Sequence, residues 1–284
     1  MLRFLFLVSA PIVVPAVRAD EAADKAATVQ FVLALQDAET GAFKVTADGK
    51  PSLRACNGGV KALRTLGADV PMLEKLKTFA AACYDAEAGC FAEPGGQPNV
   101  AINAVGILVV TELGLDKTKF AGAMTYLKEN AKSWEDVRIA AAAVEAWGVK
   151  DCPFSLEPWV KIAAAEAANA GKDDPRFAGG RLAFELRLQL KKSADPDTIL
   201  TLLGGRKADG GWSFPDKPTS DLETCYRVMR ALHLAKADIK TIPAEVAAFV
   251  KSCRKSDGGY GVTPKAPATM SGVYYAVMIE KWLK

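Results

Sequence analysis

The sequence predicts an all-α protein that is built from repeated helix hairpins. The motif Asp-Gly-Gly-Trp at residues 209–212 has a near copy, Asp-Gly-Gly-Tyr, at residues 257–260, an offset of 48 residues. Each copy leads through a proline-bearing loop into an apolar run with helical spacing, and the β-branched alternation typical of strands persists nowhere. Paired glycines before an aromatic residue suit a tight turn whose ring packs back under it. The repeating unit is therefore an outer helix, a turn, a loop and an inner helix.

The apolar spacing places six such pairs along the chain. The first turn precedes Phe43, the inner helix that follows begins at Pro51, and Gly67 suits its end. The marker aromatic returns at Phe91, again 48 residues later. We expect the six outer helices at residues 21–36, 71–84, 117–131, 156–170, 197–203 and 243–253. The inner helices that follow them are expected at residues 51–67, 99–113, 137–147, 177–190, 220–235 and 268–283.

A single helix hairpin cannot bury its apolar face, so neighbouring hairpins must stack, either as an open superhelix or as a closed ring. The alanine run at residues 140–143 permits close approach of inner helices. The last helix carries Val273, Ile279 and Trp282 and is too apolar for a solvent-exposed end repeat. Both features favour a closed ring.

Residues 1–19 are predicted to be a signal peptide. They combine a basic start at Arg3, an apolar centre interrupted by Pro11 and Pro15, and a small residue at Ala19. The alternative is an uncleaved anchor, but the run is shorter than the ~20 apolar residues that span a bilayer. We expect a secreted or periplasmic protein with residues 20–284 as one toroidal domain and no transmembrane segment.

Net charge and cysteine content limit which partners and which disulfides the protein can have. The chain has 36 basic and 33 acidic residues, and loss of Arg3 and Arg18 with the leader leaves 34 against 33. A nearly neutral body argues against a nucleic-acid partner. Export permits disulfides among the six cysteines, and Cys83 and Cys90, which bracket one predicted turn, are the first pair to test.

The repeats resemble those shared by squalene and hopene cyclases and the β subunits of protein prenyltransferases. Strong matches are Phe31 with the Gly-x-Phe at 41–43, Phe79 with the Gly-x-Phe at 89–91, and the two Asp-Gly-Gly-aromatic turns. The two central pairs match weakly. The resemblance implies an (α/α)6 toroid with a central cavity that binds an apolar or isoprenoid-like ligand and, if the protein is an enzyme, a prenyltransferase-like transferase.

In protein prenyltransferase β subunits, zinc is held by an Asp-x-Cys-Tyr segment and by a histidine at the start of the sixth inner helix. The resemblance places Glu223 and Cys225 on the first segment, but the histidine position reads Ala268 or Thr269. His233 lies ten residues past Glu223, roughly 15 Å along the helix. We therefore expect no cofactor and no prenyl transfer, with zinc at Glu223 and Cys225 as the alternative.

Aromatic residues on inner helices would line an isoprenoid funnel or pack the centre of the ring: Trp147, Tyr226, Tyr274 and Tyr275. Carboxylates at the starts of inner helices would act on a glycan or cap the helices: Glu135, Asp136, Asp173, Asp174, Asp221 and Glu223. The leading prediction is an exported toroid that binds an apolar ligand. The alternatives are a non-catalytic protein-interaction scaffold and a polysaccharide lyase or glycosidase.

Overall fold

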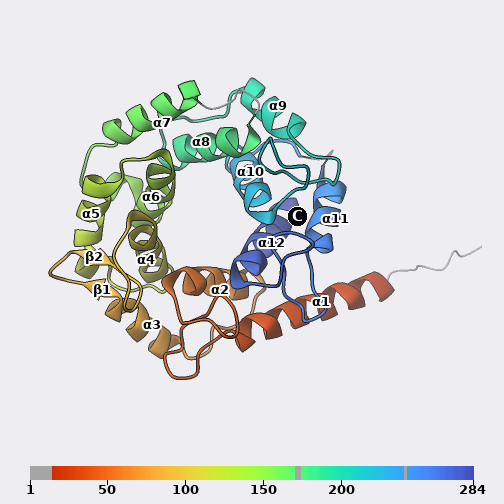
Figure 1. Ribbon diagram of the computed structural model, residues 1–284, viewed down its shortest axis with the longest axis horizontal. Coiled ribbons are helices and arrows are strands. Elements are labelled where there is room, and N and C mark those ends of the chain that lie inside the picture. Colours follow the sequence, from red (N-terminus) through yellow and green to blue (C-terminus); the bar gives the residue numbers. More distant parts are fainter. Residues whose placement is uncertain (1–14, 170–173, 240–241) are drawn as a thin grey trace, which may run out of the picture.

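The computed structural model describes residues 15–169, 174–239 and 242–284, and in these residues twelve α-helices form a closed double ring (Figure 1). The inner ring comprises α2 (Leu53–Thr65), α4 (Val100–Glu112), α6 (Trp134–Trp147), α8 (Pro175–Arg187), α10 (Leu222–Leu234) and α12 (Met270–Leu283). The outer ring comprises α1 (Pro15–Ala34), α3 (Leu73–Ala82), α5 (Gly122–Asn130), α7 (Glu157–Asn169), α9 (Pro196–Gly204) and α11 (Pro243–Ser252). The predicted (α/α)6 toroid is confirmed.

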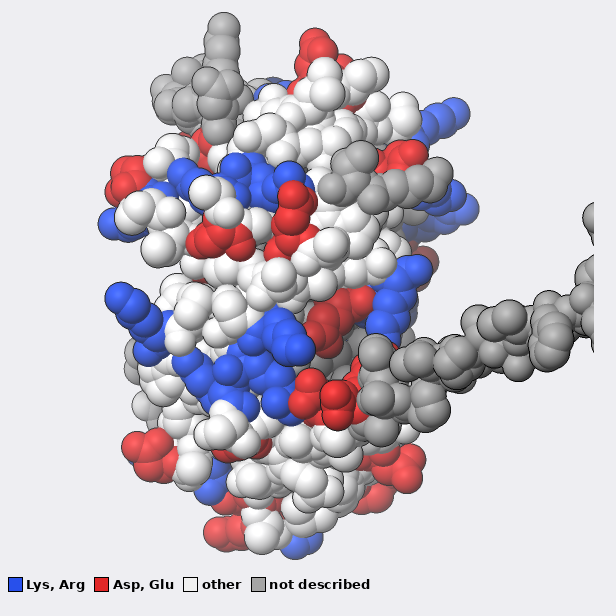
Figure 2. Space-filling model, turned by 90° about the vertical axis from the view of Figure 1, so that its right-hand side faces the viewer, with Lys and Arg blue, Asp and Glu red and all other residues white. Residues whose placement is uncertain are grey.

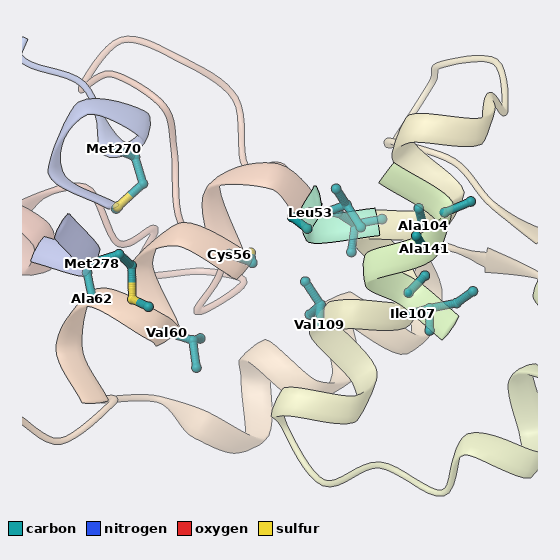
Figure 3. Packing of buried hydrophobic residues seen from close by; sticks show 14 of the residues in the cluster. Leu53, Cys56, Val60, Ala62, Ala104, Ile107, Val109, Ala141, Met270 and Met278 are labelled. Atoms are coloured by element: carbon teal, nitrogen blue, oxygen red, sulfur yellow. The ribbon is translucent and has the colours of Figure 1, made fainter. Parts of the chain in front are cut away.

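The ring closes because the sixth hairpin packs on the first. Each inner helix contacts the next one, and α12 contacts α2. The Met270 backbone N–H donates to the carbonyl of Val45 at 2.9 Å, and the Thr28 hydroxyl donates to the carbonyl of Gly258 at 2.9 Å. Met270 and Met278 of α12 and Val60 and Ala62 of α2 are buried at this junction and belong to the apolar cluster that also includes residues of α4 and α6 (Figure 3).

Every inner helix begins at a polar cap. A side-chain oxygen accepts a hydrogen bond from a backbone N–H of the first turn, which satisfies a donor that has no partner within the helix. The capping residues are Ser52, Asn99, Ser133, Asp174, Asp221 and Thr269. The segment that precedes each inner helix therefore ends in a residue whose side chain caps that helix.

The marker aromatics are buried beneath their turns and fix each hairpin. Their backbone N–H groups donate to the following inner helix, Phe43 to Cys56 Sγ at 3.3 Å, Phe91 to Asn103 Oδ1 at 2.9 Å and Trp212 to Cys225 Sγ at 3.2 Å. Glycine makes room for the ring, because a Cβ on Gly106 would lie 2.2 Å from the ring of Phe91. Two of the six cysteines thus belong to the repeat itself.

The structure corrects several boundaries. The turns include short antiparallel pairings, of which β1 (Tyr84–Asp85) with β2 (Cys90–Phe91) is the longest, because the residues flanking a tight turn face each other. Helix α6 starts at Trp134 rather than 137, since Ser133 and Asp136 form a capping box. The segment expected at 117–131 divides into the 3-10 helix η1 (Lys117–Phe120) and α5. A second 3-10 turn, η2 (Val149–Asp151), follows α6.

The N-terminal boundary also moves. Helix α1 begins at Pro15 rather than residue 21, so the position predicted for cleavage, after Ala19, falls within it, while residues 1–14 lie outside the described residues. No helix of the described chain is long and apolar enough to cross a membrane. All six cysteines carry free thiols, and Cys90 pairs with Asp85 across the hairpin rather than with Cys83.

Candidate ligand-binding site

The inner helices enclose a cavity of about 160 Å³ at the centre of the ring. Six cationic side chains and two carboxylates line it, an excess of four positive charges in a chain whose formal net charge is +3. The cations are Arg54, Lys61, Arg138, Arg187, Arg227 and Arg230, and the carboxylates are Glu145 and Glu223. The positive charge of the protein is therefore concentrated at its centre.

The outer surface contrasts with this cavity. On the side formed by α9, α11 and α1, acidic and basic residues lie interspersed (Figure 2). Ion pairs join Arg206 to Glu245 at 2.9 Å and Arg254 to Asp24 at 3.1 Å. On this face carboxylates lie beside the basic groups, whereas cations outnumber carboxylates six to two in the cavity wall.

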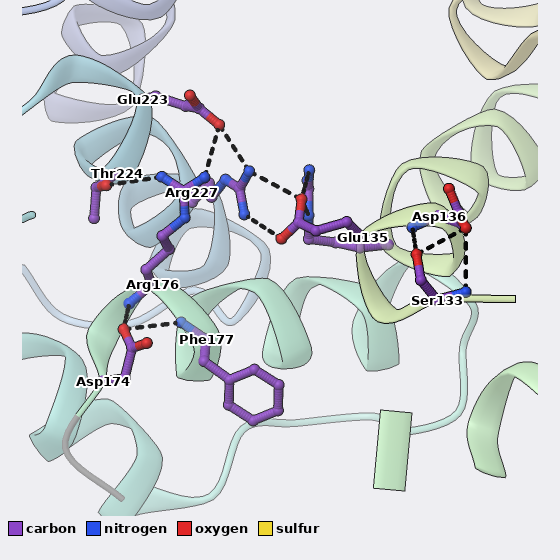
Figure 4. A network of polar contacts seen from close by, with 10 residues as sticks. Ser133, Glu135, Asp136, Asp174, Arg176, Phe177, Glu223, Thr224 and Arg227 are labelled. Carbon is purple, nitrogen blue, oxygen red and sulfur yellow. Dashed lines mark hydrogen bonds and ion pairs between the residues drawn. The ribbon is translucent and has the colours of Figure 1, made fainter. Parts of the chain in front are cut away.

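A charged network links α6, α8 and α10 near the starts of these helices (Figure 4). Arg227, whose side chain is only 8% exposed, pairs with Glu135 at 2.9 Å and with Glu223 at 2.7 Å. Arg176 also pairs with Glu223, at 3.1 Å, and Arg138 pairs with Glu135 at 2.7 Å. Neighbouring hairpins are thus joined by two carboxylates, each of which forms ion pairs with two arginines.

Both carboxylates of this network are ionised at neutral pH. Partial burial opposes the charge on Glu135, but hydrogen bonds from Arg227 and Arg138 outweigh it and lower the pKa of Glu135 to about 2. Burial likewise opposes the charge on Glu223, and the positive charges of Arg227 and Arg176 lower its pKa. Neither group is available as a protonated acid.

A second group of charges lies deeper, toward the ends of α6, α8 and α10. Glu145 pairs with Arg187 at 3.2 Å and with Arg230 at 3.1 Å. Lys61 has no ion-pair partner among the described residues, and burial lowers the pKa of its ammonium group. Arg230 Nε and Asn57 Oδ1 are buried and have no hydrogen-bond partner in the described chain. Buried polar atoms without partners are rare in folded proteins and call for an explanation, such as a water or an ion beside them.

Three tyrosines form the aromatic part of the cavity wall. The hydroxyls of Tyr226 on α10 and Tyr274 on α12 lie 2.7 Å apart. The ring of Tyr226 also packs against those of Tyr275 and Trp282, with centroids 5.2 and 5.3 Å away. The two hydroxyls share a hydrogen bond at the edge of the cationic cavity.

The surroundings drive the pKa values of this pair apart. Burial alone would raise the pKa of Tyr226, but the charges of Arg187 and Arg230 outweigh burial and lower it. The hydrogen bond with Tyr274 and the charge of Lys61 act in the same direction. Burial raises the pKa of Tyr274 well above its ordinary value, and negative charge on Tyr226 adds to this effect. One phenol is stabilised as the anion and the other as the acid.

The structure brings Tyr226, Tyr274 and Tyr275 together as lining residues, but Trp147 does not join them. Trp147 is the last residue of α6 and is buried, with the ammonium group of Lys117 5.4 Å from its ring centroid. The cavity face of α6 is set by Arg138 and Glu145. Trp147, two residues beyond Glu145, points to another side of the helix.

The two residues matched to zinc ligands do not converge. Cys225 is fully buried, and its Sγ accepts the Trp212 N–H at 3.2 Å on the side of α10 that faces the turn, while Glu223 faces the arginines. Burial raises the pKa of the Cys225 thiol well above its usual range, so the thiolate that binds zinc is disfavoured. His233 is exposed and stacks on Trp282.

The donor set therefore does not fit zinc. Within the described residues, no group of three or more His, Cys, Asp or Glu side chains is placed to hold a metal ion. Of the other carboxylates expected at inner-helix starts, Asp136, Asp174 and Asp221 cap their helices, and Asp173 lies outside the described residues.

Sequence reasoning missed the cations, although a signal was present. On α2, Arg54 and Lys61 are seven residues apart in an otherwise largely apolar helix, and on α10 Glu223, Arg227 and Arg230 follow helical spacing. Residues at these spacings share one helix face. An inner helix has apolar neighbours on both sides, so such a charged stripe must face the centre of the ring.

A family model for the prenyltransferase alpha-alpha toroid domain matches residues 5–136 and 183–284. No curated protein matches the chain by sequence. Among solved structures, a glycosidase variant superposes with a TM-score of 0.62 at 12% identity, covering 95% of this chain and 99% of its own.

Two further solved structures superpose equally well. The type II terpene cyclase MstE from Scytonema, in complex with geranylgeranyl dihydroxybenzoate, has a TM-score of 0.60 at 10% identity, covering 93% of this chain and 97% of its own. A protein from Actinoplanes has a TM-score of 0.60 at 13% identity, covering 93% and 98%. At these identities the likeness concerns the fold.

Proposed function

The chain belongs to the prenyltransferase alpha-alpha toroid domain family, and on that premise we propose that it is an exported protein whose central cavity binds a small organic anion. The observation that carries this proposal is the convergence of six cationic side chains from α2, α6, α8 and α10 on one cavity. Cations within a low-dielectric wall attract and hold anions more strongly than the same groups on an open surface.

The size of the cavity limits the ligand. A volume of about 160 Å³ is close to the ~150 Å³ that holds a benzene molecule. One six-membered ring or one diphosphate group fills such a space, whereas a long isoprenoid chain extends beyond it. The ligand class is therefore a carboxylate or phosphate on a small ring or at the head of a longer molecule.

An isoprenoid ligand remains within this class if it carries an anionic head. Val105, Leu108 and Ile139 form an apolar stretch of the wall beside the cations and could contact the first isoprene unit of a prenyl diphosphate. The MstE cyclase, which has this fold, has a structure in complex with its substrate geranylgeranyl dihydroxybenzoate. Prenyl transfer itself is not proposed, because Glu223 and Cys225 do not form a zinc site.

Two features speak against a glycosidase and against a non-catalytic scaffold. A general acid of a glycosidase needs a carboxyl group with a raised pKa, whereas the pKa values of Glu135 and Glu223 are lowered. A scaffold function has no use for an open, cationic centre with unpartnered buried atoms such as Arg230 Nε.

Isothermal titration calorimetry with four probes tests the proposal. Galacturonate and farnesyl diphosphate carry the anion, and galactose and farnesol are their neutral counterparts. We expect at least one anionic probe to bind at least tenfold more tightly than its neutral counterpart. The galacturonate and diphosphate arms distinguish a sugar acid from an isoprenoid.

The matched variants are Lys61→Met and Lys128→Met. Lys61 has no ion pair with any described residue, so its replacement removes one charged donor, worth about 1.5–3 kcal/mol or roughly 10–100-fold in Kd. Lys128 is exposed on the outer helix α5, and its replacement should leave binding unchanged. Equal binding of neutral and anionic probes, or equal affinity of the two variants, would contradict the proposal.

A further inference from the structure

Building on the proposed function, we propose that Tyr226 and Tyr274 are a catalytic base and acid that remove a proton from the carbon next to a bound carboxylate and expel a leaving group from the following carbon. The substrate class is a uronate within a polysaccharide. The reaction is a β-elimination, which needs neither metal nor cofactor.

The first support is geometry. The two hydroxyls lie 2.7 Å apart on neighbouring inner helices, and both side chains line the cavity. They occupy equivalent positions of adjacent repeats, 48 residues apart. A proton can pass directly between two oxygens at this distance.

The second support is the charge around the pair. Lys61 on α2, Arg187 on α8 and Arg230 on α10 all favour the anionic form of Tyr226. Glu145 on α6 opposes them, but it is already paired with both Arg187 and Arg230. Tyr226, whose lowered pKa favours loss of its proton, is the base of the pair, and Tyr274, whose raised pKa favours retention of its proton, is the acid.

The third support is the place left for a carboxylate. The cations that surround Tyr226 also attract the substrate carboxylate, and the buried Arg230 Nε is a donor that has no hydrogen-bond partner among the described residues. Neutralising the carboxylate by charged donors stabilises the negative charge that develops when the adjacent C–H bond is broken. A uronate adds a hexose-sized ring that matches the cavity volume.

The step balances within the protein and the substrate. The Tyr226 phenolate takes the proton from C5 of the uronate, whose electron pair forms the C4=C5 double bond. The bond from C4 to the glycosidic oxygen breaks, and this oxygen takes the proton of Tyr274. Transfer of the proton from Tyr226 to Tyr274 through their hydrogen bond restores both groups.

The first experiment observes the protein alone. Among the six tyrosines, Tyr226 has a lowered pKa and the other five have raised values. An ultraviolet absorbance titration should show one tyrosinate forming before the rest. This first ionisation should disappear in Tyr226→Phe, move to higher pH in Tyr274→Phe and stay in Tyr126→Phe, a change on the outer helix α5. An early ionisation that persists in Tyr226→Phe, or none in the wild type, would overturn the inference.

The second experiment observes the substrate. Oligomers of galacturonate, mannuronate and glucuronate are incubated with the full chain in D2O. We expect one of them to exchange its C5 proton and to give the absorbance of a double bond conjugated to a carboxylate. Tyr226→Phe should lower this rate at least about 100-fold while calorimetry shows binding retained. Tyr274→Phe should slow elimination more than exchange, because the acid serves the leaving group.

The outcomes separate the two proposals. Binding of the oligomers without exchange or elimination would overturn the proton-transfer pair and leave anion binding intact. Absence of binding for every anionic probe would overturn the proposed function as well.

Discussion

Replacing Cys225 by alanine tests whether this thiol holds the repeat together or binds a metal. The side chain is fully buried, and its Sγ accepts the backbone N–H of Trp212 at 3.2 Å. Alanine leaves that buried N–H without an acceptor, a cost of about 1–3 kcal/mol. Loss of the buried sulfur adds roughly 1 kcal/mol, by analogy with a methylene group. We expect a total loss of about 2–4 kcal/mol in the free energy of unfolding.

Urea unfolding followed by circular dichroism, under reducing conditions at neutral pH, measures this loss. Cys56→Ala should cost a similar amount, because Cys56 accepts the Phe43 N–H in the first repeat. Cys225→Ser keeps an acceptor and should cost less. Cys152→Ala is the control, since that thiol is part-exposed and donates one long hydrogen bond, 3.5 Å, to the carbonyl of Phe154. A loss below about 0.5 kcal/mol for Cys225→Ala would refute the structural role.

A zinc titration of the same proteins completes this test. A ligand present at 100 times its Kd stabilises a protein by about 2.7 kcal/mol. We expect zinc to leave the unfolding free energies of wild type and Cys225→Ala equally unchanged. Zinc-dependent stabilisation that vanishes in Cys225→Ala would show that Glu223 and Cys225 bind the metal after all.

Three further predictions follow from the packing and the charges. Gly106→Ala should cost about 1–3 kcal/mol in unfolding free energy, because the added Cβ would overlap the ring of Phe91. At Gly204 an added Cβ meets no atom within 4 Å, so Gly204→Ala should leave the unfolding free energy nearly unchanged. Equal losses of stability in the two variants would contradict the packing of Phe91 on Gly106. Burial raises the pKa of Glu93 above 4.5, so the folded state binds its proton more tightly than the unfolded state. Wild-type stability should therefore fall relative to Glu93→Gln as pH rises above about 4.5, and the opposite slope in urea titrations would contradict the burial of this carboxyl group. Protein recovered from outside the cytoplasm of its host should begin at Asp20 by mass spectrometry, and an intact Met1 would contradict cleavage.

The fold could be predicted because one turn recurs. The aromatic residue of each turn is buried against its own hairpin, so the 48-residue offset between Trp212 and Tyr260 fixed both the repeat and the helix alternation. Boundaries that depend on side-chain caps were less accurate. The Ser133 cap starts α6 at Trp134, three residues before the apolar Val137 at which the spacing predicts the helix to begin.

The site was harder to predict because it is assembled from several inner helices. The 48-residue offset between repeats also predicts contacts, since equivalent positions of adjacent repeats lie side by side. Tyr226 and Tyr274 are 48 residues apart and share a hydrogen bond, and Arg64 and Glu112, also 48 apart, form an ion pair at 2.6 Å. Trp147 has no such counterpart among the cavity tyrosines, and residue type alone does not separate it from them.

A crystal structure of the full chain in saturating galacturonate or diphosphate tests the central claim most directly. We expect a closed ring with the anion inside it, within hydrogen-bond distance of Lys61 and Arg230. An empty cavity, or an anion bound only on the outer surface of the ring, would contradict it.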